Sequence, residues 1–210
     1  MVMEYDMKIR FIALILVVQL AVSSAGCLSP ASPPQQTPLP ATPPTPESTS
    51  ATVPPGDMAL QLTDVPPDYL LKDRTVIAYS EVSQLARDLG WRQGYRVMFY
   101  RMNREKDDMT GIRQSISVYP PENMDKVYAI ETEGILSGEN GTKRYEIPFP
   151  GIGDRSMAFR ETRVGDPLDF AVYTVIFKKK NVFETITMGG TSTDYETLKD
   201  VVRKAADKIQ

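Results

Sequence analysis

The pattern of apolar and polar positions after residue 57 predicts a mixed α+β domain. In the stretch 112–119, the apolar residues Ile112, Ile116 and Val118 alternate with polar ones, as in a strand that buries one face. Similar patterns predict strands at 75–78, 95–102, 143–149, 156–162, 168–177 and 182–188. Because residues 170–177 are apolar on both faces, we expect this strand in the middle of the sheet.

Three other segments carry apolar residues at helical spacing. Ser80 is suited to cap the first helix and Gly90 to end it, and a second helix is expected over 122–136. Thr193 and Glu196 form a capping box before the third. The third helix has an apolar stripe at Leu198, Val201, Val202, Ala205 and Ile209. The sequence therefore predicts an α+β fold, an antiparallel β-sheet flanked by helices, with a C-terminal amphipathic helix that packs on the sheet.

The N-terminal residues have a different pattern. Lys8 and Arg10 precede the nearly continuous apolar run 11–22, and small residues then lead to Cys27. The run has about 12 residues, whereas a membrane-spanning helix needs roughly 20. We therefore interpret residues 1–26 as a secretory signal peptide, with retention as a signal anchor as the alternative.

The only cysteine of the chain, Cys27, lies directly after this segment. Ala25, Gly26 and Cys27 resemble the end of a lipoprotein signal, in which small residues precede a lipidated cysteine. Bacterial signals usually have an aliphatic residue where this chain has Ser24, and looser versions are common in archaeal lipoproteins. The resemblance implies lipidation at Cys27 and an exported protein anchored to the outer face of the cytoplasmic membrane.

Residues 27–57 are dominated by Pro, Ser and Thr and contain no aromatic residue. Such a segment cannot bury enough apolar surface to offset the entropy of ordering, and its proline content favours extended polyproline II. We interpret it as a disordered, semi-rigid tethering linker. The remaining residues, 58–210, are expected to form one globular α+β domain.

The composition excludes several kinds of chemistry. The chain has no histidine, so histidine-based catalytic triads and histidine zinc sites are impossible. With one cysteine it forms no internal disulfide and no thiolate metal cluster. The net charge is −3 and no long basic block is present, so nucleic acid is not an expected partner.

The remaining motifs are weak candidates for chemistry. Gly151 and Gly153 form a G-x-G pattern, but the residues that follow alternate like a strand, which favours a tight turn over a phosphate site. Acidic residues near Asp108 lack the spacing of a calcium loop. We therefore predict no catalytic residue, no metal site and no cofactor. Asn140, in Asn140-Gly141-Thr142, is a possible N-glycosylation site.

The order of these elements, the turn Gly151-Ile152-Gly153-Asp154 before a strand, and a hairpin of the F-K-K-K-N-V type before the last helix resemble the PsbP-like fold. That fold includes the extrinsic protein of photosystem II and mycobacterial lipoproteins of the LpqN type. The resemblance implies a non-catalytic accessory or binding domain at a membrane surface. It identifies no binding residue.

Two functional hypotheses follow from these patterns. The first is a membrane-anchored extracytoplasmic lipoprotein that performs no chemistry and binds an unidentified protein or small-molecule ligand. Its lipid or its N-terminal helix would attach it to the membrane. The alternative is a cell-envelope hydrolase that works with carboxylates and without histidine. It requires two acids about 5 to 10 Å apart in a cleft, one of them with a raised pKa.

Overall fold

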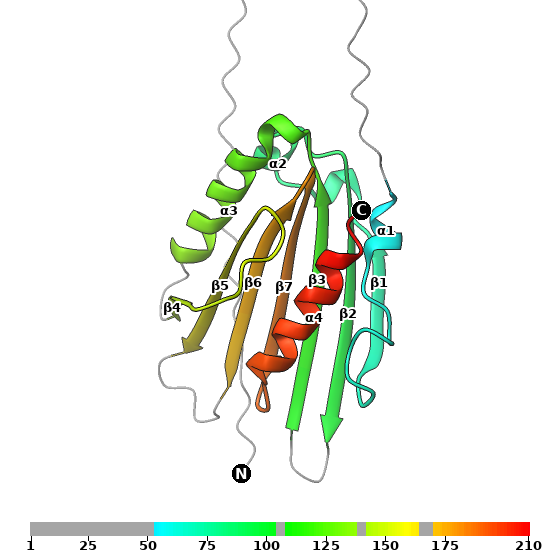
Figure 1. Ribbon diagram of the computed structural model, residues 1–210, viewed down its shortest axis with the longest axis vertical. Coiled ribbons are helices and arrows are strands. Elements are labelled where there is room, and N and C mark those ends of the chain that lie inside the picture. The colour runs from blue at the N-terminus through cyan, green and yellow to red at the C-terminus, as the bar shows by residue number, and fades with distance from the viewer. Residues whose placement is uncertain (1–52, 104–107, 138–141, 164–169) are drawn as a thin grey trace, which may run out of the picture. The chain divides into compact units, whose positions relative to one another are not determined.

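The computed structural model describes residues 53–103, 108–137, 142–163 and 170–210. Over these ranges the chain forms a seven-stranded antiparallel sheet with helices on both faces (Figure 1), which confirms the predicted α+β class. The strands are β1 Leu70–Val76, β2 Gln93–Asn103, β3 Asp108–Val118, β4 Thr142–Ile147, β5 Arg155–Arg163, β6 Ala171–Lys179 and β7 Val182–Gly190. The α-helices are α1 Pro55–Met58, α2 Gln84–Asp88, α3 Met124–Ser137 and α4 Tyr195–Asp207.

The strand order is β1-β2-β3-β7-β6-β5-β4, so two meanders join where β3 pairs with β7. The middle strand is therefore β7, and the prediction that the strand at 170–177 lies in the middle was wrong. That strand, β6, is an interior strand. Its Ile176 packs with the α3 cluster and its Val175 and Phe177 with the α4 cluster. Helices on both faces explain its apolar pattern without a central position.

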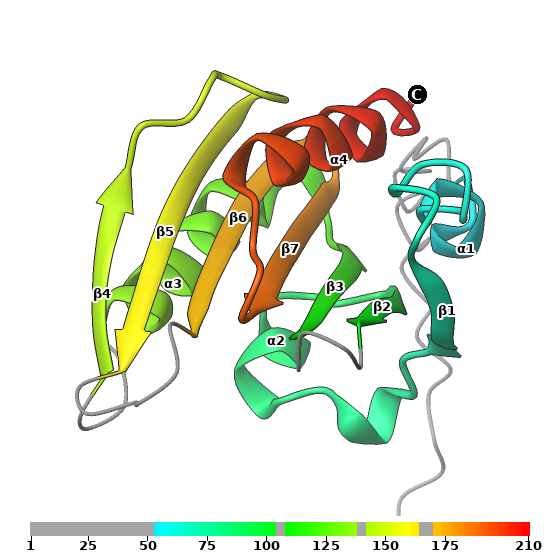
Figure 2. The ribbon, with the colours of Figure 1, turned by 90° about the horizontal axis from the view of Figure 1, so that it is seen from below.

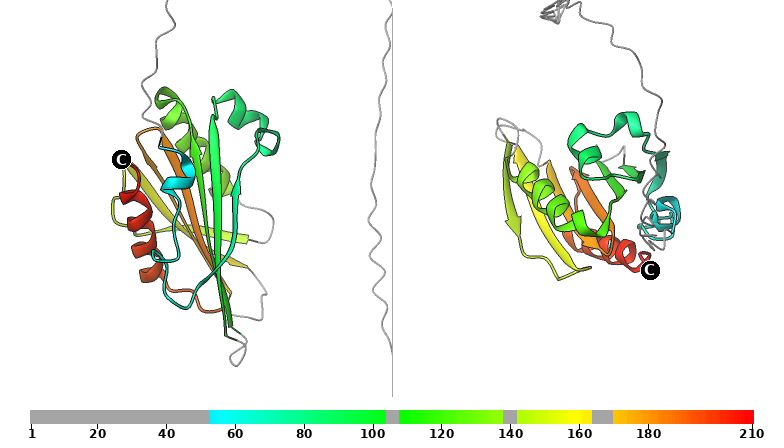
Figure 3. Two further views of the ribbon diagram at one scale, coloured as in Figure 1. Left: turned by 90° about the vertical axis from the view of Figure 1, so that its right-hand side faces the viewer. Right: turned by 90° about the horizontal axis from the view of Figure 1, so that it is seen from above.

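One face of the sheet, which we call the closed face, is covered by α4 and by the segment 53–69 that carries α1. Figure 2 shows α4 across one side of the sheet, and in the left view of Figure 3 α1 lies on the same side as α4. The predicted stripe of α4 is buried there and packs on buried strand residues that include Phe99, Ile112, Ile186 and Met188. This face holds the larger of the two cores.

The opposite face, which we call the open face, is covered over only part of its length. Met124, Val127 and Tyr128 of α3 pack against the β5, β6 and β7 residues Phe159, Ile176 and Phe183. Trp91, just after α2, joins this smaller core and donates its indole N–H to Ser117 Oγ at 3.3 Å. Toward Asn103 and Asp108, large apolar side chains of this face remain exposed.

Two helix caps differ from the prediction. Ser83, not Ser80, caps α2, since Ser83 Oγ accepts a hydrogen bond from Ala86 N at 3.1 Å and Ser80 lies in the preceding 3₁₀ turn Tyr79–Glu81. Asp194, not Thr193, caps α4, because its two carboxylate oxygens accept from the N–H groups of Glu196 at 3.1 Å and Thr197 at 3.2 Å. A carboxylate serves two free donors at once, which a single hydroxyl at Thr193 does not.

The G-x-G pattern lies in a strand-to-strand connection, as predicted, but this connection has seven residues between β4 and β5, and only one of its two glycines has a positive φ. Gly153 has a φ of +64°, and a Cβ there would lie 2.5 Å from the backbone oxygen of Lys178. In the hairpin between β6 and β7 the residue with positive φ is Lys180, at 55°, and not Asn181 as its side chain suggested. Asp154 Oδ2 accepts a hydrogen bond from Lys180 N at 2.7 Å and so holds this turn.

The predicted signal segment 1–26, the lipidation residue Cys27, most of the linker and Asn140 lie outside the described residues. Within the described ranges, no helix is both long and apolar enough to cross a membrane. The described residues of both cores fall between 53 and 210. This part of the chain therefore contains complete hydrophobic cores of its own, which is the condition for independent folding.

Candidate binding groove

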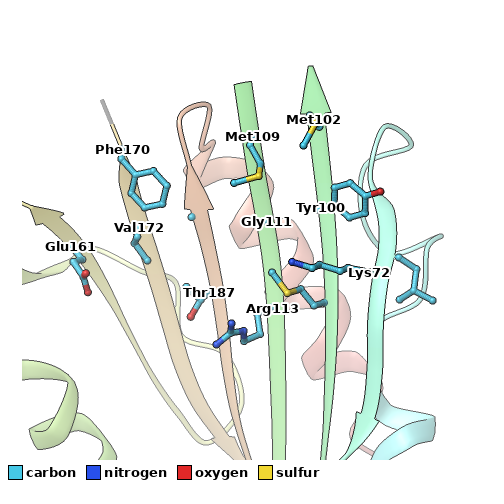
Figure 4. A pocket seen from close by; sticks show the side chains of 13 residues that line it. Lys72, Tyr100, Met102, Met109, Gly111, Arg113, Glu161, Phe170, Val172 and Thr187 are labelled. Carbon is cyan, nitrogen blue, oxygen red and sulfur yellow. The ribbon is translucent and has the colours of Figure 1, made fainter. Parts of the chain in front are cut away.

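The part of the open face that no described helix covers forms a groove of about 780 Å³, which we call the open groove. Residues of β1, β2, β3, β5 and β7 line the groove (Figure 4). Val172 of β6 and Phe170, which lies just before β6, complete the lining. Its apolar lining consists of Leu71, Met98, Met102, Met109, Phe170 and Val172. A volume of this size is within the range of pockets that hold small ligands.

The floor of the groove is formed by two glycines in the middle of the sheet. Gly111 of β3 pairs directly with Gly189 of β7. The neighbours in the same row are Tyr100, which pairs with Gly111, and Val172, which pairs with Gly189. The row therefore has side chains on both sides and none in the centre, which leaves a short trough over β3 and β7 that the side chains of Met109 and Arg113 bound along β3.

Methionines supply much of the apolar surface beside this trough. Met102 and Met109 are 52% and 55% exposed, although they lie opposite each other on paired strands. Met98 lies on the same face of β2, four residues from Met102 and beyond Tyr100. Methionine has an unbranched and polarisable side chain that adapts to irregular shapes, and it is frequent on surfaces that bind varied apolar partners.

Two cations, Lys72 and Arg113, also line the groove. Lys72 is the extra residue of a β-bulge, since Leu71 pairs with Phe99 and Asp73 with Met98. The bulge lets the successive residues Leu71 and Lys72 both line the groove, which regular alternation does not allow. The side chains of Lys72 and Arg113 make no hydrogen bond or ion pair with any residue in the described part of the chain.

Glu161 of β5 is the single carboxylate among the described lining residues. Arg144 Nε lies 2.6 Å from Glu161 Oε2, and Arg144 also donates to the backbone oxygen of Ile135 at 2.9 Å. The charge of Glu161 is therefore compensated from β4, outside the lining of the groove. The lining thus has a cationic character where Lys72 and Arg113 lie.

An acid with a strongly raised pKa is present, but it lies on the closed face. Burial raises the pKa of Glu184 to about 8, and the hydrogen bond donated by Gln114 at 2.8 Å lowers it only in part. Gln114 in turn accepts a hydrogen bond from Leu60 N at 2.8 Å. These three residues form a buried polar link between the segment 53–69, β3 and β7.

No protein-family model matches the chain, and no curated protein matches it in a sequence comparison. Among solved structures, however, one match covers most of the described domain. The fold resembles that of the extracellular domain of PknH from Mycobacterium tuberculosis. The TM-score is 0.55 and the sequence identity is 9%, over 72% of this chain and 92% of that chain. At this identity the likeness to the PknH domain concerns the fold alone.

The residues that the sequence singled out do not meet at one site. Gly151 and Gly153 lie in the turn before β5, which is not part of the groove lining. Asp108 is held by Thr191, whose Oγ1 donates to it at 2.9 Å, and by Arg101 at 3.7 Å. Within the described residues, no group of three His, Cys, Asp or Glu side chains is placed to hold a metal ion.

The open groove itself was missed by the sequence reasoning. Its signal is present in the chain, because Gly111 and Gly189 interrupt two strands that otherwise carry side chains at every position of this face. A glycine inside a strand often marks a place where a ligand or another backbone approaches closely. That the two glycines face each other became visible only with the pairing of β3 and β7.

Proposed function

We propose that this protein is a membrane-tethered extracytoplasmic binding domain whose open groove holds an apolar ligand without chemical transformation. The observation that carries the proposal is the groove itself. Soluble domains rarely leave a contiguous apolar surface uncovered unless it binds something. Here Met102 and Met109 stay more than half exposed beside a floor of two glycines.

The proposed location rests on the N-terminal pattern and on the fold. The apolar run 11–22, followed by Cys27 and a proline-rich segment, is typical of an exported and lipidated chain with a spacer. The likeness to an extracellular domain is compatible with that location. The resemblance of the element order to PsbP-like accessory domains at membrane surfaces supports the same proposal.

A role without chemistry agrees with the side chains of the groove. Hydrolysis by carboxylates needs a second acid about 5 to 10 Å from the first. The described lining supplies only Glu161, which is paired with Arg144. Glu184, the buried acid with a raised pKa, lies on the closed face behind the sheet. The alternative of a carboxylate hydrolase therefore finds no pair of acids in the groove.

The proposal is tested on the full chain, extracted from its own membranes in mild detergent and analysed by native mass spectrometry. We expect a mass that begins at Cys27 and includes lipid, together with a co-purified apolar molecule. The variant Gly111→Leu should lose that molecule, because its side chain fills the trough. Gly134→Leu is the matched control, since Gly134 lies on α3 and a Cβ there meets no atom within 4 Å.

Two results would contradict parts of this proposal. A chain with no bound molecule in either the wild type or Gly134→Leu would leave the groove without a ligand-binding role. An intact N-terminus would show a retained signal anchor in place of a lipid anchor. The anchor is tested separately by Cys27→Ser, which should move the protein from the membrane fraction to the soluble fraction if lipid at Cys27 is the tether.

A further inference from the structure

We propose that the open groove binds a single-chain amphiphile with an anionic head, of the fatty-acid class. Its alkyl chain would lie over Gly111 and Gly189, and its head would meet Arg113 and Lys72. This inference rests on the proposed function and specifies its ligand. Three features of the groove carry it: the shape of the trough, the placement of the two cations, and the orientation of the lining on the face of the sheet.

The shape of the trough fits one extended chain. Neither Gly111 nor Gly189 has a positive φ, and a Cβ at Gly111 would meet only Phe99 O at 3.6 Å and Met98 Cε at 3.7 Å. These are ordinary contact distances, so neither backbone conformation nor internal packing requires glycine at 111. Glycine in a strand interior costs stability. A ligand that occupies the space above the strand would explain why residue 111 is a glycine.

The dimensions of the trough agree with an alkyl chain. Met109 and Arg113 lie four residue steps apart on β3, which at about 3.4 Å per step corresponds to about 14 Å, and between them Gly111 leaves this face without a side chain. The side walls are Tyr100 on β2 and Val172 on β6. Val172 Cγ2 and Phe170 Cζ lie 3.4 Å and 3.9 Å from the position of a Cβ at Gly189, so the trough is narrow and a branched or polycyclic ligand would meet these side chains.

The charges are placed where a head group would lie. Arg113 is two residues beyond Gly111 on the same face of β3. It pairs with Thr187 of β7, which also lines the groove. Lys72 reaches the groove from β1 through the bulge (Figure 4). Both cations lack a partner in the described structure, whereas Glu161 is paired with Arg144. An anion held by both would form charge-assisted hydrogen bonds.

The orientation of the lining argues against an extended peptide as the occupant. Peptides that extend a sheet bind at its edge, where backbone N–H and C=O groups are free. The trough of the open groove lies over β2, β3, β7 and β6, which are interior strands with partners on both sides, and the edge strand β1 adds Leu71 and Lys72 at one side. Their backbone groups are used within the sheet, so the groove offers side-chain contacts and two cations.

The experiment uses the chain from residue 53 to 210, which contains both complete cores. Laurate and dodecanol, which share an alkyl chain and differ in the charged head, are titrated by isothermal calorimetry. We expect laurate to bind more tightly than dodecanol. Gly111→Leu should weaken both ligands at least about tenfold, because it removes the space that the chain needs. Arg113→Gln should weaken laurate about tenfold and leave dodecanol nearly unchanged.

Matched controls separate these effects from general damage. Gly134→Leu adds the same side chain on α3, and Arg203→Gln removes one exposed positive charge from α4 on the closed side. Both should bind laurate like the wild type. Circular dichroism and thermal unfolding show whether Gly111→Leu is folded, and if it is not, Gly111→Val replaces it as the smaller blocking variant.

The outcomes distinguish this inference from the proposed function. Equal binding of laurate and dodecanol, both lost in Gly111→Leu, would overturn the anionic head and leave an apolar binding groove. Binding of neither, while the full chain still loses a co-purified molecule in Gly111→Leu, would overturn the amphiphile class and keep the groove. Laurate binding that Gly111→Leu leaves intact would place the ligand elsewhere and overturn the inference.

Discussion

The two faces of the same sheet differ in how their side chains are used. On the closed face, α4 and the segment 53–69 bury residues such as Phe99, Ile186 and Met188 almost completely. On the open face, α3 covers one end and the other end exposes Met102 and Met109. One face therefore supplies most of the core, and the second can carry a recess at little cost in stability.

The difference arises within single strands. In β3, Ile112 is buried on the closed face, whereas its neighbours Gly111 and Arg113 line the open groove. Because successive side chains of a strand point to opposite faces, one strand serves packing and binding at the same time. A shift of register by one residue would place Arg113 in the core, so the packing of the closed face also fixes the geometry of the groove.

The largest effect is expected from the buried acid of the closed face. The carboxyl of Glu184 keeps its proton to about pH 8 in the folded protein, against 4.5 as its ordinary pKa. Between these values the folded state binds more protons than the unfolded state, so stability is full below pH 4.5 and falls as pH rises toward 8. We expect a loss of roughly 5 kcal/mol over that window, at up to about 1.4 kcal/mol per pH unit.

Glu184→Gln should remove most of this slope, since the amide does not ionise and still accepts from Gln114. The free energy of unfolding from urea titrations at several pH values measures the slope for each variant. Glu133→Gln, on the exposed surface of α3, should keep the wild-type slope. An unchanged slope in Glu184→Gln would mean that the ionisation of Glu184 does not control how the free energy of unfolding depends on pH.

A matched pair of methionines compares the two faces directly. Met188→Ala removes a side chain that is 1% exposed on the closed face and should cost about 3 kcal/mol. Met109→Ala removes one that is 55% exposed in the open groove and should cost less than about 0.5 kcal/mol. Both values come from the midpoint and slope of chemical denaturation. Equal losses would show that the open face is packed, and the contrast between the faces would be wrong.

The existence and type of the main elements could be predicted from the sequence. The alternation of Ile112, Ile116 and Val118 identified β3, and the apolar stripe from Leu198 onward identified α4. These patterns are strong because each element buries one side against a large core. The position of β6 could not be predicted in this way, since an apolar strand between two helical layers has the same pattern at any interior place.

Details that depend on one or two hydrogen bonds were harder to predict. Ser80 and Ser83 both precede the helix α2, and only the backbone geometry decides which hydroxyl reaches a free N–H. The positive φ at Lys180 depends on Asp154, a residue distant in the chain whose carboxylate accepts its N–H. Local propensity favoured Asn181, and a tertiary contact determined the outcome.

The groove depends on a strand pairing that the sequence does not state, whereas the signal of the buried acid lies within one strand. The buried carboxyl of Glu184 was not predicted, although Glu184 alternates with the apolar residues Val182, Ile186 and Met188 on one face of β7. Gly111 and Gly189, in contrast, form a trough only because β3 pairs with β7 in one register. That pairing joins strands about 70 residues apart and is set by long-range packing.

A smaller effect is expected at the cap that orients α4 over the closed face. Asp194→Ala should cost about 1 kcal/mol, because two N–H groups of the first turn lose their acceptor. Hydrogen bonding to Thr197 and to the backbone lowers the pKa of Asp194, so this contribution is present at neutral pH and is lost as pH falls through the folded pKa. Thr193→Ala should change the unfolding midpoint little at any pH. The reverse order of the two variants would restore Thr193 as the cap.

The smallest effect, and the one that separates stability from binding, is expected at Gly111. A Cβ there meets only atoms at ordinary contact distance, so Gly111→Ala should stabilise the free domain by about 0.5 kcal/mol through the reduced entropy of the unfolded chain. Gly153→Ala should instead destabilise it, since that Cβ would lie 2.5 Å from Lys178 O at a φ of +64°. Thermal unfolding of both variants, beside laurate titration of Gly111→Ala, makes the comparison. A Gly111→Ala variant that is more stable and binds laurate less well would show that the open face keeps a glycine for its ligand at the expense of stability. A destabilised Gly111→Ala variant would instead assign Gly111 a structural role. The closed and open faces would then be under the same packing constraint.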